Sequence, residues 1–240
     1  MQRHDYHPQQ RHDRGPERIN EVSILALLNR FTFSILPCGL EEAREAVRVH
    51  CARARKVLVV DETRYRDVRM IYFSDDGPDH LPITNLAIMM TTVDGSDGKR
   101  TLLVNSVSDG FLSLIYSMSN TIRGIHLMVS VSRLDLKFPR NSILAVANGD
   151  LVRTVYAMRD SGAWVFFEKG DPLPFEDADN YRARRKKDRL TPEIISACLT
   201  RIGYGSLRQE FWVDQTARAH VMATRDFRFW HPDQEPSNGR

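Results

Sequence analysis

Short apolar segments in which alternate residues are large or β-branched dominate the second half of the chain. They span residues 125–132, 142–147, 151–158 and 163–168. Alternation with a period of two is the pattern of β-strands. Asn148-Gly149 and Ser161-Gly162 join the last three segments, and such residue pairs suit the positive φ angles of tight hairpin turns. The pattern therefore predicts an antiparallel meander.

The first half of the chain mixes helical and extended patterns. Leu40, Ala43, Val47 and Cys51 recur every three or four positions, which predicts an amphipathic helix over residues 40–55. Strands are predicted at residues 57–60, 68–74, 86–93 and 100–107. The glycines of Asp94-Gly95-Ser96-Asp97-Gly98 favour a hairpin between the last two of these strands.

Four further segments complete the predicted fold. Residues 19–31 suit a short buried helix, and residues 111–122 fit a helix or a strand, with spacing that favours the helix. Thr191-Pro192 is a capping pair that begins another helix, and Gly203 is placed to end it. Residues 211–213 and 220–224 read as a last hairpin or an edge strand. The predicted fold class is α+β, a mostly antiparallel β-sheet packed against a few helices.

Composition sets the expected organisation. The 240 residues are 42% hydrophobic and 27% charged, which suffices for one folded domain. We place that domain at residues 18–230, with disordered tails at residues 1–17 and 231–240, because the tails have little to bury. The three cysteines lack metal or disulfide spacing. A cytoplasmic protein without a membrane span is the expectation.

A run of basic residues is the strongest candidate surface. Six cationic side chains lie between residues 182 and 189, on a predicted helix that begins near Asp177. Three alternatives remain open: a solvated face with internal ion pairs, a contact with a protein partner, or binding to nucleic acid phosphates. Because the net charge is only +3, any nucleic acid binding would have to be local. With the neighbouring aromatic residues, the candidate partner-binding set is Phe175, Tyr181, Arg182, Arg184, Arg185, Lys186, Lys187 and Arg189.

A second candidate site is an acidic turn that follows a predicted strand. Asp75, Asp76, Asp79 and His80 group oxygen ligands with an imidazole, which suits a hard cation or, with a distant residue such as His126, a general base. A solvated surface turn is the alternative. Cys38 lies just before a predicted helix, a position that can lower a thiol pKa.

The sequence contains no G-x-S-x-G, H-E-x-x-H, G-x-x-x-x-G-K-[ST] or G-x-G-x-x-G motif. We therefore expect no cofactor and no metal, and an interaction role ranks above an enzymatic one. The first hypothesis is a non-enzymatic protein-interaction module that uses residues 172–189. Small bacterial immunity, antitoxin and adaptor proteins have this general character. The rivals are a hydrolase-type enzyme with an Asp/His site and a weak nucleic-acid binder that uses the basic helix.

Overall fold

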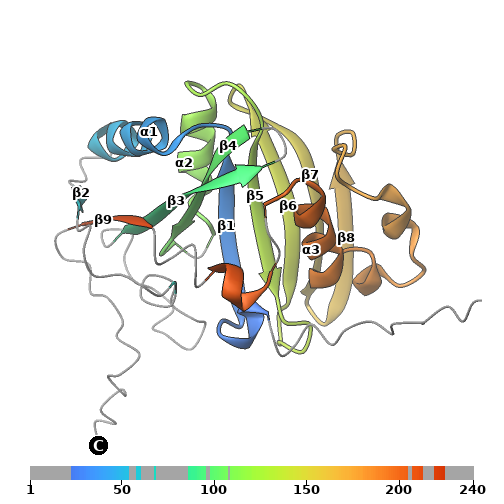
Figure 1. The fold of residues 1–240 in the computed structure, drawn as a ribbon. Coiled ribbons are helices and arrows are strands. Elements are labelled where there is room, and N and C mark those ends of the chain that lie inside the picture. Colours follow the sequence, from blue (N-terminus) through green and yellow to red (C-terminus); the bar gives the residue numbers. More distant parts are fainter. Residues whose placement is uncertain are drawn as a thin grey trace, which may run out of the picture.

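A computed structural model describes residues 23–53, 58–60, 68, 86–95, 98–107, 109–204, 207–212 and 219–224. Its strands are β1 (Arg30–Leu36), β2 (Leu58–Val60), β3 (Ala87–Gly95), β4 (Gly98–Asn105), β5 (His126–Ser132), β6 (Arg140–Ala147), β7 (Asp150–Asp160), β8 (Ala163–Lys169) and β9 (His220–Thr224). They form one antiparallel sheet in the order β2-β9-β3-β4-β1-β5-β6-β7-β8, with β1 in its middle (Figure 1). The predicted α+β class is confirmed.

The meander of the second half is also confirmed, because β5, β6, β7 and β8 are neighbours in the sheet. Asn148 and Gly149 have φ angles of 52° and 80°, and Ser161 and Gly162 have φ angles of 48° and 87°. Positive φ at both central residues is the signature of a type I′ hairpin turn, whose twist matches that of the strands it joins. The hairpin predicted around Gly98 forms as well, since β3 pairs with β4 as far as Gly95 and Gly98.

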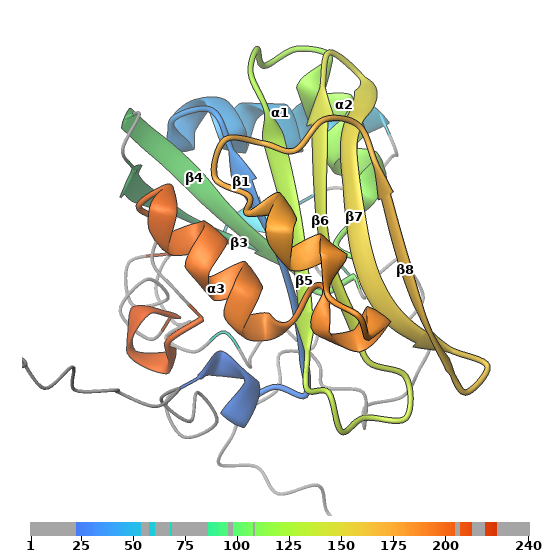
Figure 2. The same cartoon turned by 90° about the vertical axis from the view of Figure 1, so that its right-hand side faces the viewer.

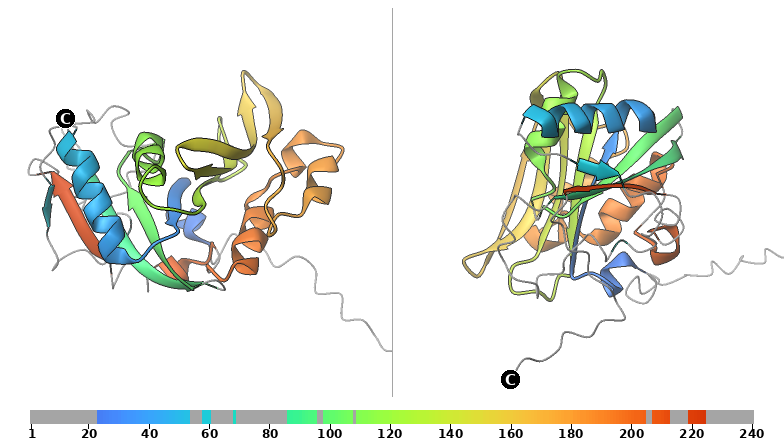
Figure 3. Two further views of the ribbon diagram at one scale, coloured as in Figure 1. Left: turned by 90° about the horizontal axis from the view of Figure 1, so that it is seen from above. Right: turned by 90° about the vertical axis from the view of Figure 1, so that its left-hand side faces the viewer.

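Helices cover both faces of the sheet. Helices α1 (Leu40–Arg53) and α2 (Leu112–Ser119) lie on one face, and α3 (Pro192–Arg201) lies on the other (Figures 2 and 3). Thr191 caps α3 by accepting a hydrogen bond from the Ile194 amide at 3.4 Å, as its sequence predicts. Because both faces of the central strand β5 are covered, every one of its residues is buried. Strand β8 lies at the end of the strand order and is partly exposed.

Two apolar cores follow from this arrangement. The core under α3 includes the rings of Phe31, Phe33 and Trp212, with Trp212 at centroid distances of 4.6 Å and 4.8 Å from the two phenylalanines. Edge-to-face aromatic pairs of this kind add to the free energy gained from burial. The core under α1 and α2 contains Val47, Cys51 and residues from β3, β4 and α2.

Several predictions of local structure need correction or are not tested. A helix was predicted over residues 19–31, but the described part of that range, residues 23–31, contains a single 3₁₀ turn (Ile24–Ala26), and β1 already begins at Arg30. Strand β9 lies inside the sheet between β2 and β3, rather than at an edge. The residues of the predicted tails and nearly all of the predicted strand at 68–74 lie outside the described residues. None of the described helices has the length and apolarity needed to cross a bilayer.

Candidate interaction surface

The chain that follows β8 packs across the sheet and carries the predicted basic run. It forms two 3₁₀ turns, η4 (Ala178–Arg182) and η5 (Lys186–Asp188), rather than the single helix expected from the sequence. Ala183 interrupts the helical geometry with φ −52° and ψ 141°, and its carbonyl accepts a hydrogen bond of 2.8 Å from Arg189. Tertiary contacts on both sides of this break outweigh the favourable helical propensity of the alanine, arginine and lysine residues around it.

A buried arginine holds the start of this segment in place. The Arg153 side chain on β7 is 1% exposed, and the Glu176 side chain that it binds is 0% exposed. The guanidinium donates from Nη2 at 2.7 Å and from Nε at 3.1 Å to the two carboxylate oxygens, which makes a bidentate pair. Its Nη1 donates to the Gly170 carbonyl at 2.7 Å, and Tyr181 donates its hydroxyl proton to Glu176 at 2.7 Å. We call Arg153, Glu176 and Tyr181 the anchor.

The electrostatics of the anchor follow from its burial. Burial by itself lowers the pKa of Arg153, but the hydrogen bonds and the charge of Glu176 outweigh it, so that the pKa lies above its ordinary value. Burial, and then the hydrogen bond to Glu176, raise the pKa of Tyr181. The Arg153 guanidinium and the Tyr181 phenol therefore keep their protons throughout the physiological range.

The eight predicted partner-binding residues divide into two groups. Phe175 is half-buried, Tyr181 is buried in the anchor, and Arg189 is half-buried with its guanidinium 5.2 Å from the centre of the Phe166 ring. Tyr181, which the sequence placed in the partner-binding set, is therefore buried beneath the surface. The exposed group comprises Arg182, Arg184, Arg185, Lys186 and Lys187.

Internal ion pairs take up part of this exposed charge. Arg182 pairs with Asp179 at 3.2 Å, and Arg185 pairs with Asp188. Such solvent-exposed pairs contribute about 0–1 kcal/mol and exchange readily with water or with a partner. None of the ion pairs found among the described residues involves Arg184, Lys186 or Lys187. We call these three residues the basic patch.

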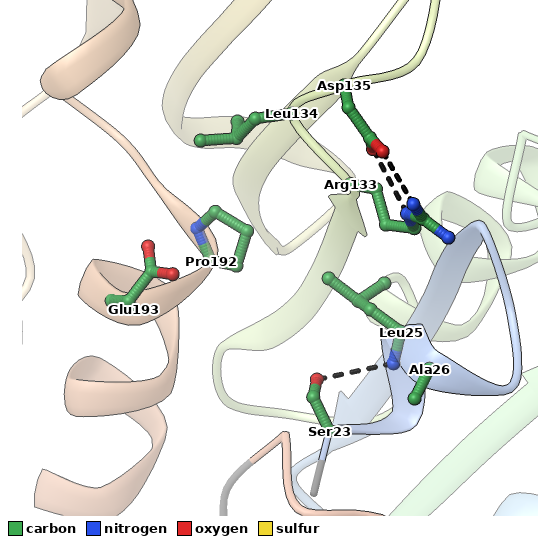
Figure 4. Close-up of a pocket in the computed structure, with 8 residues that line it drawn as sticks. All are labelled: Ser23, Leu25, Ala26, Arg133, Leu134, Asp135, Pro192 and Glu193. Atoms are coloured by element: carbon green, nitrogen blue, oxygen red, sulfur yellow. Dashed lines mark hydrogen bonds and ion pairs between the residues drawn. The ribbon is translucent and has the colours of Figure 1, made fainter. Parts of the chain in front are cut away.

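A pocket of about 530 Å³ lies where the start of α3 meets the 3₁₀ turn before β1 (Figure 4). Ser23 accepts a hydrogen bond of 3.2 Å from the Leu25 amide in its wall, and Arg133 forms an ion pair with Asp135 at 2.5 Å. Because Ser23, Arg133 and Asp135 already have partners, these groups do not converge on a ligand.

A smaller cavity of about 380 Å³ lies on the α3 face of the sheet. Its floor contains Ile35 of β1 and Leu127 of β5, which are opposite one another in the sheet. Arg201 at the end of α3 closes one side and donates to the Phe175 carbonyl at 3.0 Å, which ties the loop after β8 to the helix. Phe175 therefore lines a cavity rather than an open surface.

The structure also locates part of the alternative, acidic site. Asp75, Asp76, Asp79 and His80 lie outside the described residues. His126 is fully buried beneath α2, and burial lowers its pKa to about 4. No group of three or more His, Cys, Asp or Glu side chains suited to a metal ion occurs in the described part of the chain.

The reactive-thiol hypothesis for Cys38 is wrong. The residue is buried, and burial is the main cause that raises the pKa of its thiol to about 12. A thiol with this pKa holds its proton at neutral pH and is a weak nucleophile.

Sequence reasoning missed both charged members of the anchor. Arg153 carried a usable signal, because it shares the buried face of β7 with Val155 and Ala157 at a spacing of two residues. A basic residue at such a position requires a buried partner. Glu176 carried no comparable signal, since it lies in an irregular acidic stretch that resembles any surface loop.

No protein family model, no curated protein and no solved structure matches this chain.

Proposed function

We propose that the chain is a non-enzymatic binding protein whose basic patch contacts an acidic surface of a protein partner. Immunity, antitoxin and adaptor proteins are the classes in which such a role is found. The observation that carries the proposal is the anchor: a buried, bidentate ion pair fixes an irregular segment whose basic side chains face water.

Fixing the segment matters for binding because a flexible loop must be ordered when its partner arrives. Ordering the backbone costs about 1–2 kcal/mol per residue. A segment that is ordered before binding avoids much of this cost. A buried ion pair seldom adds net stability compared with apolar packing, so its value in this fold is the conformation that it specifies.

The charge of the surface favours an acidic partner. The exposed basic side chains lie within a few residues of one another, and complementary charge accelerates association and excludes like-charged partners. Phosphates of a nucleic acid are the alternative anions, but Tyr181, the aromatic residue beside the run, is buried and offers no stacking surface.

Affinity capture from the source cells tests the proposal. The variant Arg184→Glu/Lys186→Glu/Lys187→Glu reverses the basic patch, and we expect it to lose a stoichiometric acidic protein that the unaltered chain captures. Capture of the same protein by the variant, or no stoichiometric protein with the unaltered chain, would contradict the proposal.

A matched control separates the patch from net charge. The variant Lys99→Glu/Arg123→Glu/Lys137→Glu reverses three exposed basic residues elsewhere on the molecule, and we expect it to capture the partner normally. Binding of a single-stranded DNA 30-mer by the unaltered chain, with an affinity that falls steeply as salt rises, would favour nucleic acid instead.

A further inference from the structure

We propose that the cavity of about 380 Å³ on the α3 face binds a small amphipathic monocarboxylate, a molecule with an apolar body and one acidic group. This inference is independent of the basic patch and of any protein partner. The inference rests on the volume of the cavity, its apolar lining and the two arginines in its wall.

The apolar part of the lining comes from elements that the sheet and α3 hold firmly. Ile35 and Leu127 are buried in the floor, and Tyr204, just beyond α3, is buried in the wall. Ile125 also lines the cavity, although 42% of its surface is exposed to water. The volume falls in the range of about 300–1,000 Å³ that is usual for small-molecule sites, which are mostly apolar with a few placed polar groups.

Arg100 of β4 and Arg201 of α3 are the charged residues that line the cavity among the residues that the structure describes, and both are cationic. Arg100 points to the same face of the sheet as Leu102, two residues further along β4, so its side chain lies at the end of the apolar floor. A guanidinium beside apolar surface suits a ligand whose carboxylate accepts hydrogen bonds while its body leaves water.

Neighbouring charges limit the ligand to a single negative charge. Asp177 lies 3.6 Å from Arg201 and offsets part of its charge from outside the cavity lining. The Phe175 carbonyl already accepts a hydrogen bond of 3.0 Å from Arg201. A second anionic group would meet the oxygens of this loop and be repelled.

The test uses 4-phenylbutyrate and its neutral counterpart 4-phenylbutanamide as probes, titrated into the full chain and followed by NMR and calorimetry. We expect saturable binding of the acid, with shifts at Leu127 and Ile202, and binding of the amide that is weaker by about tenfold or more, since charged hydrogen bonds are the stronger ones. Equal binding of acid and amide, or no saturable binding of the acid, would overturn the proposal.

Two variants locate the site. Arg100→Gln removes the cation, and we expect it to weaken binding of the acid by about tenfold while changing binding of the amide little. Ile125→Trp fills the exposed mouth and should weaken both probes, which keeps the proposal testable if Arg100→Gln fails to fold. Arg123→Gln, an exposed arginine outside the lining, is the control. Binding of the acid by either cavity variant at the unaltered affinity would refute the assignment.

Discussion

Neutralising Glu176 should destabilise the protein far more than neutralising Glu168, although both carboxylates bind the same guanidinium. The Glu176 side chain is fully buried and lies 2.7 Å from Arg153 Nη2, whereas the Glu168 side chain is 44% exposed and lies 3.2 Å from the same atom. The substitution Glu176→Gln leaves a buried guanidinium without its main counter-charge. Breaking a buried pair in this way costs about 3–5 kcal/mol. The exposed pair with Glu168 is worth about 1 kcal/mol or less.

Urea denaturation followed by circular dichroism measures this difference. We expect Glu176→Gln to lower the free energy of unfolding by about 3 kcal/mol, which for a chain of this size lowers Tm by about 6–12 °C. Glu168→Gln is the matched control and should stay within about 1 kcal/mol of the unaltered protein. Adding Arg153→Met to Glu176→Gln should recover stability, because it removes the uncompensated buried charge. Similar losses for the two carboxylate variants would show that the anchor is not the buried pair described above.

Three further outcomes are expected. Gly162→Ala should lower the free energy of unfolding by about 1–2 kcal/mol, because of its positive φ alone. Gly170→Ala should lower it by at least about 2 kcal/mol more, because its new β-carbon would lie 2.1 Å from the Val152 carbonyl oxygen. Equal urea midpoints for the two variants would contradict this expectation. NMR titration of His126 should give a pKa of about 4 rather than 6.5, so that about 3 kcal/mol of unfolding free energy present above pH 6.5 is lost as the pH falls towards 4. The variant His126→Met should not lose this part of its unfolding free energy in acid. A measured pKa near 6.5 would refute the expectation. Reversing the exposed basic patch should change the unfolding free energy by no more than about 0.5 kcal/mol, measured in the same urea experiment.

The sequence allowed the meander to be predicted because its information is local. Asn148-Gly149 and Ser161-Gly162 adopt the positive φ angles that their residue types favour, and the strands that each turn joins pair with each other. Local signals of this kind predict the folded structure correctly because adjacent strands joined by tight turns pair with each other. The start of α3 at the Thr191 cap could be predicted for the same reason.

The features that sequence reasoning missed depend on contacts between distant residues. The segment that forms β9 was expected in a last hairpin or at an edge, but it pairs with residues 87–90 on β3, more than a hundred positions earlier in the chain. The basic run was expected to be helical, but the anchor and the contact of Arg189 with Phe166 decide its shape. Neither the partner of a buried arginine nor the lining of a cavity can be inferred from one sequence without its fold.

The most direct test of the central proposal is the reactivity of individual lysines in the complex. Purified protein and the captured complex are treated with an acetylating reagent, and modification at Lys186 and Lys187 is compared with that at Lys99 and Lys137 by mass spectrometry. All four lysines are exposed in the free chain. We expect the partner to protect Lys186 and Lys187 while Lys99 and Lys137 react as before. Full reactivity of Lys186 and Lys187 in the complex would place the partner elsewhere and contradict the account.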